Sequence, residues 1–301
     1  MTAAIAADVL DKLKQAGRIA AAARDAGARL ITPGAKVRDV CVAVEDEIHR
    51  RGGSLAFPVQ SSRNDVAAHY CPSPEDESAY ADGDLAKLDV GVHVDGWVVD
   101  TALTVNVGDR PENRPFVDAA QAALESAIAT AGPGVAVRRV SEAIEATLRR
   151  YGMRPMQNLC GHGVARWTVH CPPAIPNAAD GTSDRLLPDA VVAVEPFATD
   201  GKGQVVERGN AEVFRLDPRR STGPGGSPEV VAAMRRFNGL PFARRQLSEF
   251  PRAAVEETLR ALRGAGHLGV YPPLVEAQQR KVAQAEHTLY LGPDGVEVLT
   301  R

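Results

Sequence analysis

The stretch LAKLDVGVHVDGWVVDTALTV, residues 85–105, alternates apolar and polar residues on both sides of a central Asp-Gly pair. An Asp-Gly pair between two valine-rich runs predicts a two-residue hairpin turn, and this turn fixes how the two strands pair. Gly91 then faces Asp100, so Asp89 and Asp100 lie on one face of the hairpin as diagonal neighbours. Because Gly91 has no side chain, we expect an open space between the two acids.

Two carboxylates placed in this way favour a divalent metal ion. Diagonal Cβ atoms on neighbouring strands lie about 7–8 Å apart or somewhat less. Like charges at that separation repel each other and raise one pKa unless a cation lies between them, and carboxylate oxygens suit a hard or borderline divalent ion. Two strand-end acids in solvent would explain a single hairpin equally well, so further ligands are needed to decide.

Composition limits the class of protein. The 301 residues are 44% hydrophobic and 24% charged, with a net charge of −3, as expected of one large globular domain or two small ones. No apolar run approaches the roughly 20 residues of a membrane span, and Asp8 interrupts the apolar core that a signal peptide needs. We therefore expect a cytoplasmic protein with no membrane partner. The net charge also argues against a specific nucleic-acid partner.

A local basic cluster stands out against this negative net charge. We expect it to be a solvated helix face. It comprises Arg235, Arg236, Arg244, Arg245 and Arg252.

An internal repeat divides the chain into two related halves. Residues 33–52, PGAKVRDVCVAVEDEIHRRG, match residues 133–152, PGVAVRRVSEAIEATLRRYG, at nine of twenty positions. The apolar spacing after each Pro-Gly predicts an amphipathic helix in both copies, and another helix precedes each one. The similarity continues weakly and aligns Asp89 with Glu195. Two such halves indicate a duplicated α+β unit, whose pseudo-twofold axis would bring the acids of both halves to one central site.

The second half supplies further candidate ligands. Glu195 interrupts the valine-rich run AVVAVEPFATDG, and Glu286 lies in AQAEHTLYL. A carboxylate in a buried strand is costly unless it is paired or binds a metal. His162 and His170 both lie in NLCGHGVARWTVHCPP. Each residue alone has an ordinary structural explanation, but two aspartates, a histidine and two glutamates on strands that can converge favour a metal pair.

In this order and context, the candidate ligands resemble those of the methionine aminopeptidases. These ligands are Asp89, Asp100, His162, Glu195 and Glu286. The segments AAHYCP, NLCGHGV, VEPFATDGKGQVVE and AQAEHT are similar to the type 2 branch in its compact prokaryotic form. The resemblance implies the pita-bread fold, an α+β class with two pseudo-symmetric halves around a central antiparallel sheet. It also implies a catalytic domain over 1–212 and 272–301, and a helical insertion over 213–271 with helices near 227–237 and 248–263.

The same resemblance implies an activity and a set of metal ligands. The enzyme would remove the initiator methionine of nascent polypeptides when the second residue is small, by attack of a hydroxide activated by two divalent ions, which are Co, Mn, Fe or Zn. Asp89 would chelate one ion, and His162 and Glu195 the other. Asp100 and Glu286 would bridge both. Glu195 would also pass a proton from the water to the leaving amine. We expect a monomer, and a transient association with the ribosome stays open.

The resemblance assigns roles to five further positions. His69 and His170, which occupy equivalent places in the two repeats, would hydrogen-bond the scissile amide and the developing oxyanion. Phe57, Val169 and Tyr271 match positions that line the methionine pocket, where such side chains suit a thioether. Ordinary core packing remains the alternative for Val169 and Tyr271.

Three cysteines lie within two residues of a candidate site histidine. They are Cys71, Cys160 and Cys171. Small side chains are wanted where backbones crowd, which is one explanation. The other is a thiol that is sensitive to oxidation or captures a metal as the thiolate.

Two rival functions belong to other classes. Prolidases and aminopeptidase P share the fold and the five ligands, but they usually carry a long N-terminal domain before the first aspartate, which we do not find here. A non-catalytic binding protein on the same fold would have lost metal ligands, whereas this chain has all five. A peptide-cleavage screen separates these alternatives.

Overall fold

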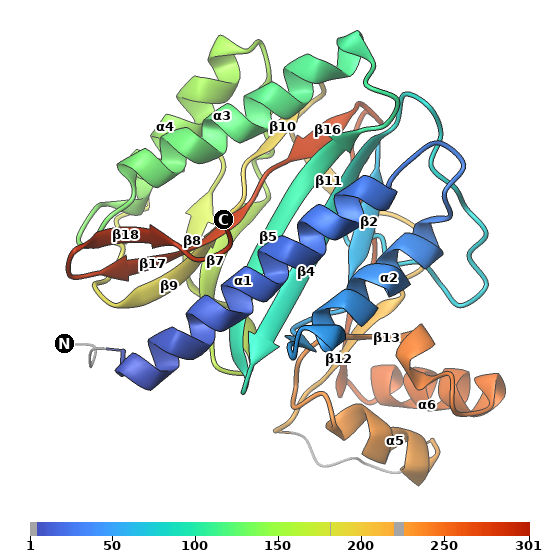
Figure 1. Ribbon diagram of the computed structural model, residues 1–301. Coiled ribbons are helices and arrows are strands. Elements are labelled where there is room, and N and C mark those ends of the chain that lie inside the picture. Colours follow the sequence, from blue (N-terminus) through green and yellow to red (C-terminus); the bar gives the residue numbers. More distant parts are fainter. Residues whose placement is uncertain (1–4, 181, 220–225) are drawn as a thin grey trace.

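The repeat in the sequence corresponds to two pairs of helices in the computed structural model (Figure 1). In each pair a longer helix leads into a shorter one through a Pro-Gly turn. The helices are α1 (Ala7–Leu30), α2 (Val37–Arg50), α3 (Arg114–Thr130) and α4 (Val137–Arg150). The bounds of α2 and α4 are thus 100 positions apart, which confirms the two amphipathic helices predicted from the repeat.

Backbone hydrogen bonds at the two turns repeat as well. Gly34 and Gly134 have φ values of +87° and +78°, a region that glycine adopts without strain. The N–H of Gly34 donates to the Tyr80 carbonyl at 2.8 Å, and the N–H of Gly134 donates to the Leu186 carbonyl at 2.7 Å. Equivalent long-range contacts therefore fix the start of α2 and of α4, as expected of a duplicated unit.

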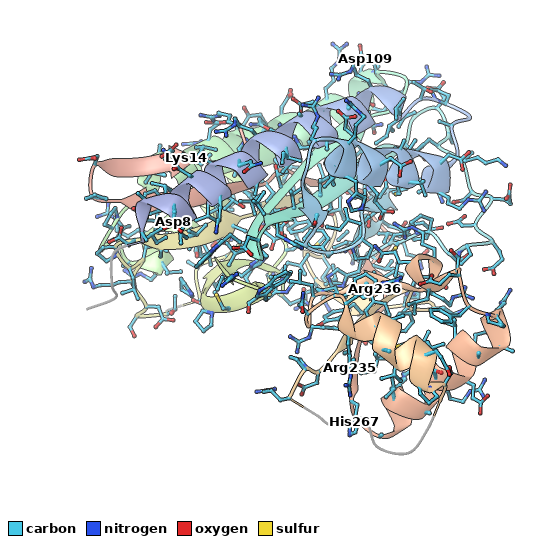
Figure 2. All side chains as sticks on the ribbon, turned by 60° about the horizontal axis from the view of Figure 1, so that its bottom comes forward. Asp8, Lys14, Asp109, Arg235, Arg236 and His267 are labelled. Atoms are coloured by element: carbon cyan, nitrogen blue, oxygen red, sulfur yellow. The ribbon has the colours of Figure 1, made fainter. Side chains whose placement is uncertain are left out.

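The structure describes residues 5–180, 182–219 and 226–301. In that part of the chain, no helix combines the length and the apolar character that crossing a membrane requires. The long helix α1 carries charged side chains at its surface, among them Asp8 and Lys14 (Figure 2). Lys14 pairs with Glu297 at 3.0 Å, so this helix is tied to the C-terminal hairpin by charge as well as by packing.

The predicted hairpin is present with the predicted register. Its strands are β4 (Leu85–Val94) and β5 (Trp97–Asn106). Gly91 pairs with Asp100, and Asp89 pairs with Ala102, which confirms that the two acids are diagonal neighbours on one face. Both residues of the Asp-Gly turn have positive φ values, 52° and 83°, as the mirror-image turn of a tight hairpin requires.

The open space expected beside Gly91 is not there. A Cβ atom built on Gly91 would lie only 2.2 Å from Cε1 of Phe57, so the aromatic ring fills the position that the missing side chain leaves. The expectation was wrong because strand alternation shows which residues share a face, not which distant side chain packs onto it. Phe57 therefore lies on the same face of the hairpin as Asp89 and Asp100.

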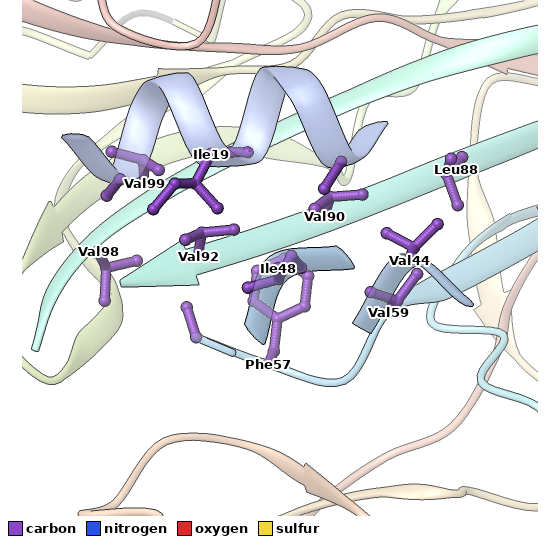
Figure 3. Packing of buried hydrophobic residues seen from close by; sticks show 14 of the residues in the cluster. Ile19, Val44, Ile48, Phe57, Val59, Leu88, Val90, Val92, Val98 and Val99 are labelled. Atoms are coloured by element: carbon purple, nitrogen blue, oxygen red, sulfur yellow. The ribbon is translucent and has the colours of Figure 1, made fainter. Parts of the chain in front are cut away.

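Helices α1 and α2 cover the opposite face of this hairpin (Figures 1 and 3). Val90 and Val92 of β4 pack with Ile19 of α1 and Ile48 of α2 in one buried cluster (Figure 3). Burial of each such side chain contributes about 1.5–3 kcal/mol. Because successive strand residues point to opposite faces, Asp89 points away from the helices and toward the second half of the molecule.

The second half contributes a five-stranded sheet with the order β18-β17-β9-β7-β8 and antiparallel pairing throughout. Its strands are β7 (Cys160–Ala165), β8 (Thr168–Pro176), β9 (Ala190–Val194), β17 (His287–Gly292) and β18 (Gly295–Val298). Helices α3 and α4 share a second buried cluster with strands of this half. Helices on one side and antiparallel strands on the other agree with the predicted α+β class.

Shorter strands extend the sheets around this frame. β1 and β2 pair with β4, β6 and β16 pair with β10, and β15 lies between β3 and β11. Their bounds are β1 (Ser54–Leu55), β2 (Gln60–Arg63), β3 (Val66–Ala68), β6 (Arg154–Pro155), β10 (Phe197–Thr199), β11 (Val205–Glu207), β15 (Leu274–Glu276) and β16 (Val282–Gln284). Hydrogen bonding thus divides the central layer into several antiparallel sheets.

The segment expected to be a helical insertion contains both predicted helices. Its elements are β12 (Val213–Leu216), α5 (Pro228–Arg235), β13 (Phe242–Ala243), a 3-10 helix (Arg244–Leu247), α6 (Arg252–Gly264) and β14 (Leu268–Tyr271). These elements share a separate buried cluster and lie together at one side of the molecule (Figure 1). The division into a catalytic domain over 1–212 and 272–301 and an insertion over 213–271 stays a prediction. Residues 220–225 of the insertion lie outside the described residues.

The basic cluster is not uniformly a solvated helix face. Arg235 and Arg236 lie in the α5 part of the molecule, at the opposite end from Asp109 (Figure 2), but the side chain of Arg245 is only 7% exposed. Its guanidinium donates to the buried carboxylate of Glu45 on α2 and to the Val59 carbonyl. The expectation was wrong because the partner acid is 200 positions away in the sequence. This pair ties the segment 213–271 to the first half.

The buried pair predicts a specific stability pattern. Arg245→Met should lower the free energy of unfolding by about 3–5 kcal/mol, because it leaves the Glu45 carboxylate buried without a counter-charge. The double variant with Glu45→Gln should be more stable than the single variant, since the uncompensated charge is then gone. Urea unfolding of the two variants measures both effects. Equal stability of the single and double variants would contradict an ion pair as the cause.

Candidate metal centre

All ten candidate site residues line one pocket of about 230 Å³. They come from both halves of the chain and from the segment 213–271. They are Phe57, His69, Asp89, Asp100, His162, Val169, His170, Glu195, Tyr271 and Glu286. The structure thus brings together residues that the sequence separates widely, while their individual roles remain predictions.

Two glycines place His162 in this pocket. A Cβ on Gly161 would lie 2.4 Å from the Ala193 carbonyl oxygen, and a Cβ on Gly163 would lie 2.5 Å from the Pro172 carbonyl oxygen. Only glycine therefore lets β7 approach β8 and β9 this closely. The sequence CGHGV gives a strand that fits between its neighbours and carries one side chain, His162, into the pocket.

The imidazole of His162 is oriented so that one nitrogen faces the acids. Its Nδ1 lies 3.2 Å from the Gly163 carbonyl oxygen, and an N–H at that position donates to the carbonyl. Nε2 then carries the lone pair, and it lies 3.8 Å from Asp100 Oδ2 and 3.6 Å from Glu195 Oε1. A histidine held through one nitrogen, with the other free, is the usual arrangement of a metal ligand.

Threonine hydroxyls align the second half against β5. The Thr288 hydroxyl accepts a hydrogen bond from the Asp100 N–H and donates to the Asp100 carbonyl, both at 2.7 Å. The Glu286 N–H donates to the Ala102 carbonyl at 2.9 Å, and the Thr101 hydroxyl donates to the Glu286 carbonyl at 2.9 Å. These bonds fix Glu286 beside Asp100. Sequence reasoning missed both threonines, although Thr101 directly follows Asp100 in VDTA and Thr288 lies two positions after Glu286 in EHT.

Gln284 is a further site residue that the sequence analysis missed. Its side-chain amide donates to Glu195 Oε2 at 3.3 Å and to Glu286 Oε2 at 3.5 Å. It lies two positions before Glu286 on the same run, so strand alternation places both on one face. That alternation in AQAE was the available signal. An uncharged donor between two glutamates orients their oxygens and adds no further charge.

The donor set fits a divalent metal. Within the described residues, three buried carboxylate oxygens have no hydrogen-bond partner: Asp89 Oδ1, Asp100 Oδ1 and Glu286 Oε1. A buried polar atom without a partner costs about 1–3 kcal/mol, and more when it is charged. Ligand atoms of Asp100, His162 and Glu286 all lie within 4.8 Å of one another. Oxygen donors with one imidazole nitrogen suit a divalent first-row ion, which would satisfy these oxygens together.

The pKa values of the acids in the pocket also favour a bound cation. Burial raises the pKa of Asp89 to about 7. Burial, and then the charges of neighbouring carboxylates, raise the pKa values of Asp100 and Glu286 well above their usual range. Burial and the charge of Asp89 do the same for the pKa of Glu195. Without a cation, the acids therefore hold protons at pH values where exposed carboxylates are ionised.

The two other candidate site histidines, His69 and His170, line the same pocket as the acids. The rings of His162 and His170 meet edge to face, with centroids 4.1 Å apart, and the His69 ring meets Tyr271 in the same way at 6.0 Å. Burial, and then the positive charge of His170, lower the pKa of His69 to about 4. His69 is therefore neutral at pH 7 and offers both a hydrogen-bond donor and an acceptor. Its φ of +66° is rare for a residue with a side chain.

The cysteines near these histidines are best explained as small residues. Burial raises the pKa values of all three thiols, that of Cys71 to about 11, so the thiolate is disfavoured at neutral pH. Cys171 lies beside Gly163, where a Cβ would be 3.0 Å from the Cys171 sulfur. Crowding between β7 and β8 thus favours a small side chain at this position.

The raised pKa of Asp89 predicts how metal-free protein responds to pH. In the unfolded chain Asp89 ionises near 3.8, and in the folded chain near 7, so its contribution to stability is lost as the pH rises from about 4 to about 7. Asp89→Asn removes this loss. At pH 8 the metal-free variant should melt above metal-free wild type by at least about 2 °C, roughly the effect of 1 kcal/mol.

Thermal melts between pH 5 and pH 8 measure this difference. The advantage should shrink toward pH 5 and reverse when a divalent ion is added, because the variant has lost a candidate ligand. Asp46→Asn on the exposed side of α2 is the matched control and should show no such reversal. An advantage independent of pH would contradict the burial of the Asp89 charge.

Comparisons with known proteins agree with this geometry. The model of metallopeptidase family M24 matches residues 11–216. A methionine aminopeptidase of Archaeoglobus fulgidus is 38% identical over 295 residues, which cover 98% of this chain and 99% of that protein. A methionine aminopeptidase of Thermococcus onnurineus is 39% identical over 296 residues, which cover 97% of this chain and 100% of that protein.

Solved structures with lower identity share the fold. A methionine aminopeptidase of Thermotoga maritima superposes with a TM-score of 0.74 at 23% identity, with complete coverage of both chains. A thermophilic Arx1 gives 0.87 at 18% identity and covers 98% of this chain and 91% of its own. A prolidase of Pyrococcus furiosus gives 0.62 at 17% identity and covers 98% of this chain but 64% of its own. With the family match, these likenesses confirm the fold expected from the sequence.

Proposed function

Because this chain belongs to metallopeptidase family M24, and within it to the methionine aminopeptidases, we propose that it removes the N-terminal methionine from nascent proteins and peptides whose second residue is small. One observation carries this proposal. A single pocket combines four acids and a histidine in ligand-like arrangement with an apolar wall that includes Phe57 and Tyr271. The enzyme is thus a metal-dependent hydrolase that acts at a free N-terminus.

The proposed ligands divide between two divalent ions, Co, Mn, Fe or Zn. Asp89 would bind one ion, His162 and Glu195 the other, and Asp100 and Glu286 both. Within the described residues, oxygens of Asp89, Asp100 and Glu286 that lack hydrogen-bond partners support metal binding by these three acids. When bound, such ions acidify a water molecule and polarise the carbonyl of the first peptide bond.

The remaining chemistry belongs to side chains of this chain. Glu195 lies in a setting that raises its pKa, so it can accept a proton from water and release it to the departing amine. Gln284 holds one oxygen of Glu195 at 3.3 Å and leaves the other for this transfer. His69 and His170, neutral and adjacent to the acids, are placed to donate hydrogen bonds to the scissile amide and to the developing oxyanion.

The pocket walls account for the proposed specificity. Phe57 packs over Gly91 next to the acids, and Val169 and Tyr271 complete an apolar surface that suits an unbranched thioether. The carboxylates attract a free α-amino group, so acetylated and internal sites are disfavoured. A bulky second residue would meet the segments around His69 and His170, and misplacing the carbonyl by about 1 Å can reduce the rate ~100-fold.

Sequence identity favours methionine aminopeptidase activity over the rival functions. Relatives at 38% and 39% identity over nearly the whole chain are methionine aminopeptidases, whereas the likeness to a prolidase is one of fold and covers 64% of that longer chain. A non-catalytic binding protein is disfavoured because all five ligands are present in one pocket. We also propose a cytoplasmic monomer that meets its substrates as nascent chains, in transient contact with the ribosome.

A peptide panel on metal-loaded protein tests the proposed function. Met-Ala-Ser should be cleaved, whereas Met-Lys-Ser, Leu-Ala-Ser and acetyl-Met-Ala-Ser should not. Asp100→Ala should lower kcat/KM by at least ~100-fold, because even groups beyond the ligands affect metal sites 10–100-fold. Asp118→Ala, which removes an exposed carboxylate on α3, is the control and should cleave like wild type.

Three outcomes would overturn the proposal in different ways. Preferential cleavage of an Xaa-Pro peptide without methionine would move the chain to the aminopeptidase P class. Failure to cleave any peptide with metal bound would favour a binding protein. Undiminished activity of Asp100→Ala would show that the carboxylate cluster is not the catalytic centre.

A further inference from the structure

Arg215 of β12 has no counter-charge in the described part of the chain. Across residues 5–180, 182–219 and 226–301, no carboxylate pairs with its guanidinium, and its buried Nε has no hydrogen-bond acceptor. Other arginines of the same segment do have acidic partners: Arg236 pairs with Glu249 at 2.7 Å, and Arg244 with Glu212 at 2.9 Å. A buried donor without an acceptor is destabilising, so the side chain lacks an ordinary structural explanation.

Strand alternation places Arg215 next to the pocket. In β12, Phe214 and Leu216 pack in the cluster of the segment 213–271, whereas Val213 lines the pocket. Arg215 lies two positions after Val213 and therefore on the same face of the strand. It is half-buried, as expected at the mouth of the pocket rather than at its floor.

The neighbouring strand brings a second polar group to this point. Tyr271 pairs with Val213, and Gly269 pairs with Arg215, so the residue opposite the guanidinium has no side chain. A Cβ built on Gly269 would lie 3.4 Å from the Tyr271 hydroxyl and 3.6 Å from the Arg215 Cβ. The hydroxyl of a pocket residue thus lies beside the arginine and offers a second hydrogen-bonding group.

A second side chain lies at the outer end of the pocket. His170 of β8 lines this pocket and is exposed to solvent. His170 and Arg215 therefore both lie toward solvent, whereas Asp100 and Glu286 are buried. The acids occupy the inner end, so a bound peptide with its amino group among them leaves past His170 and Arg215.

We propose that Arg215 forms a carboxylate-binding subsite for the residue that follows the second residue of the substrate. The proposal rests on the proposed function, because it takes the direction of the peptide from it. A guanidinium binds a carboxylate through two parallel hydrogen bonds. The carboxylate belongs either to an acidic side chain at the third position or to the C-terminus of a tripeptide. A lysine at the third position is repelled.

The test compares isosteric peptides on the metal-loaded enzyme. Met-Ala-Asp-amide and Met-Ala-Asn-amide differ only in charge, and Met-Ala-Asn with a free C-terminus presents the other source of a carboxylate. The ratio of kcat/KM, charged to neutral, should be roughly tenfold in wild type, the effect of one hydrogen bond to a charged group. Arg215→Met should bring this ratio to about 1, and Arg215→Lys should keep part of it.

An affinity measurement and a control variant complete the test. Analogues with a reduced first peptide bond cannot be hydrolysed, so their affinities for the metal-loaded enzyme give the same ratio by calorimetry without turnover. Arg219→Met removes an 85% exposed guanidinium four positions further along and should leave the ratio unchanged.

The results separate this inference from the proposed function. Cleavage of the neutral peptide with no carboxylate preference, or a preference that survives in Arg215→Met, overturns the subsite alone. A different result is that no peptide is cleaved, but the analogues bind with a carboxylate preference that Arg215→Met removes. This result supports the subsite and overturns the proposed function. If Met-Ala-Asp-amide shows the preference, the carboxylate is that of an acidic side chain. If Met-Ala-Asn with a free C-terminus shows it, the carboxylate is the C-terminus of the peptide.

Discussion

The structure depends on holding like charges together. Asp89, Asp100, Glu195 and Glu286 converge on one small pocket, and three of their buried oxygens have no partner among the described residues. Burial raises the pKa values of all four acids, and repulsion by neighbouring carboxylates raises those of Asp100, Glu195 and Glu286 further. This is unfavourable unless a cation compensates. The surrounding fold supplies the rigidity that this arrangement requires, and a divalent metal supplies the compensation.

Rigidity comes from interactions that join the two halves. The hydroxyl of Thr288 makes two hydrogen bonds to the backbone of Asp100, so a candidate ligand of one half is held by a strand of the other. The glycines around His162 let β7 lie close to its neighbours. The buried pair of Arg245 and Glu45 joins the segment 213–271 to helix α2. Contacts from several distant parts of the chain therefore hold the side chains of the pocket in place.

The sequence predicted those features that depend on local pattern. Alternation around one Asp-Gly pair gave the register that brings Asp89 beside Asp100, and the repeat gave the helices α2 and α4 with matching bounds. Features that depend on which distant residues meet were missed. Phe57 fills the space above Gly91, and Arg245 is buried rather than solvated. Neither contact leaves a periodic signal, because each joins residues from unrelated stretches.

The central claim is that a divalent metal replaces protons among buried carboxylates. Calorimetric titration of metal-free protein with Mn or Co at pH 7, in two buffers of different protonation enthalpy, counts the ions bound and the protons released. The account predicts two ions per chain and the release of at least one proton as they bind. Binding of no ion, or binding without proton release, would contradict it.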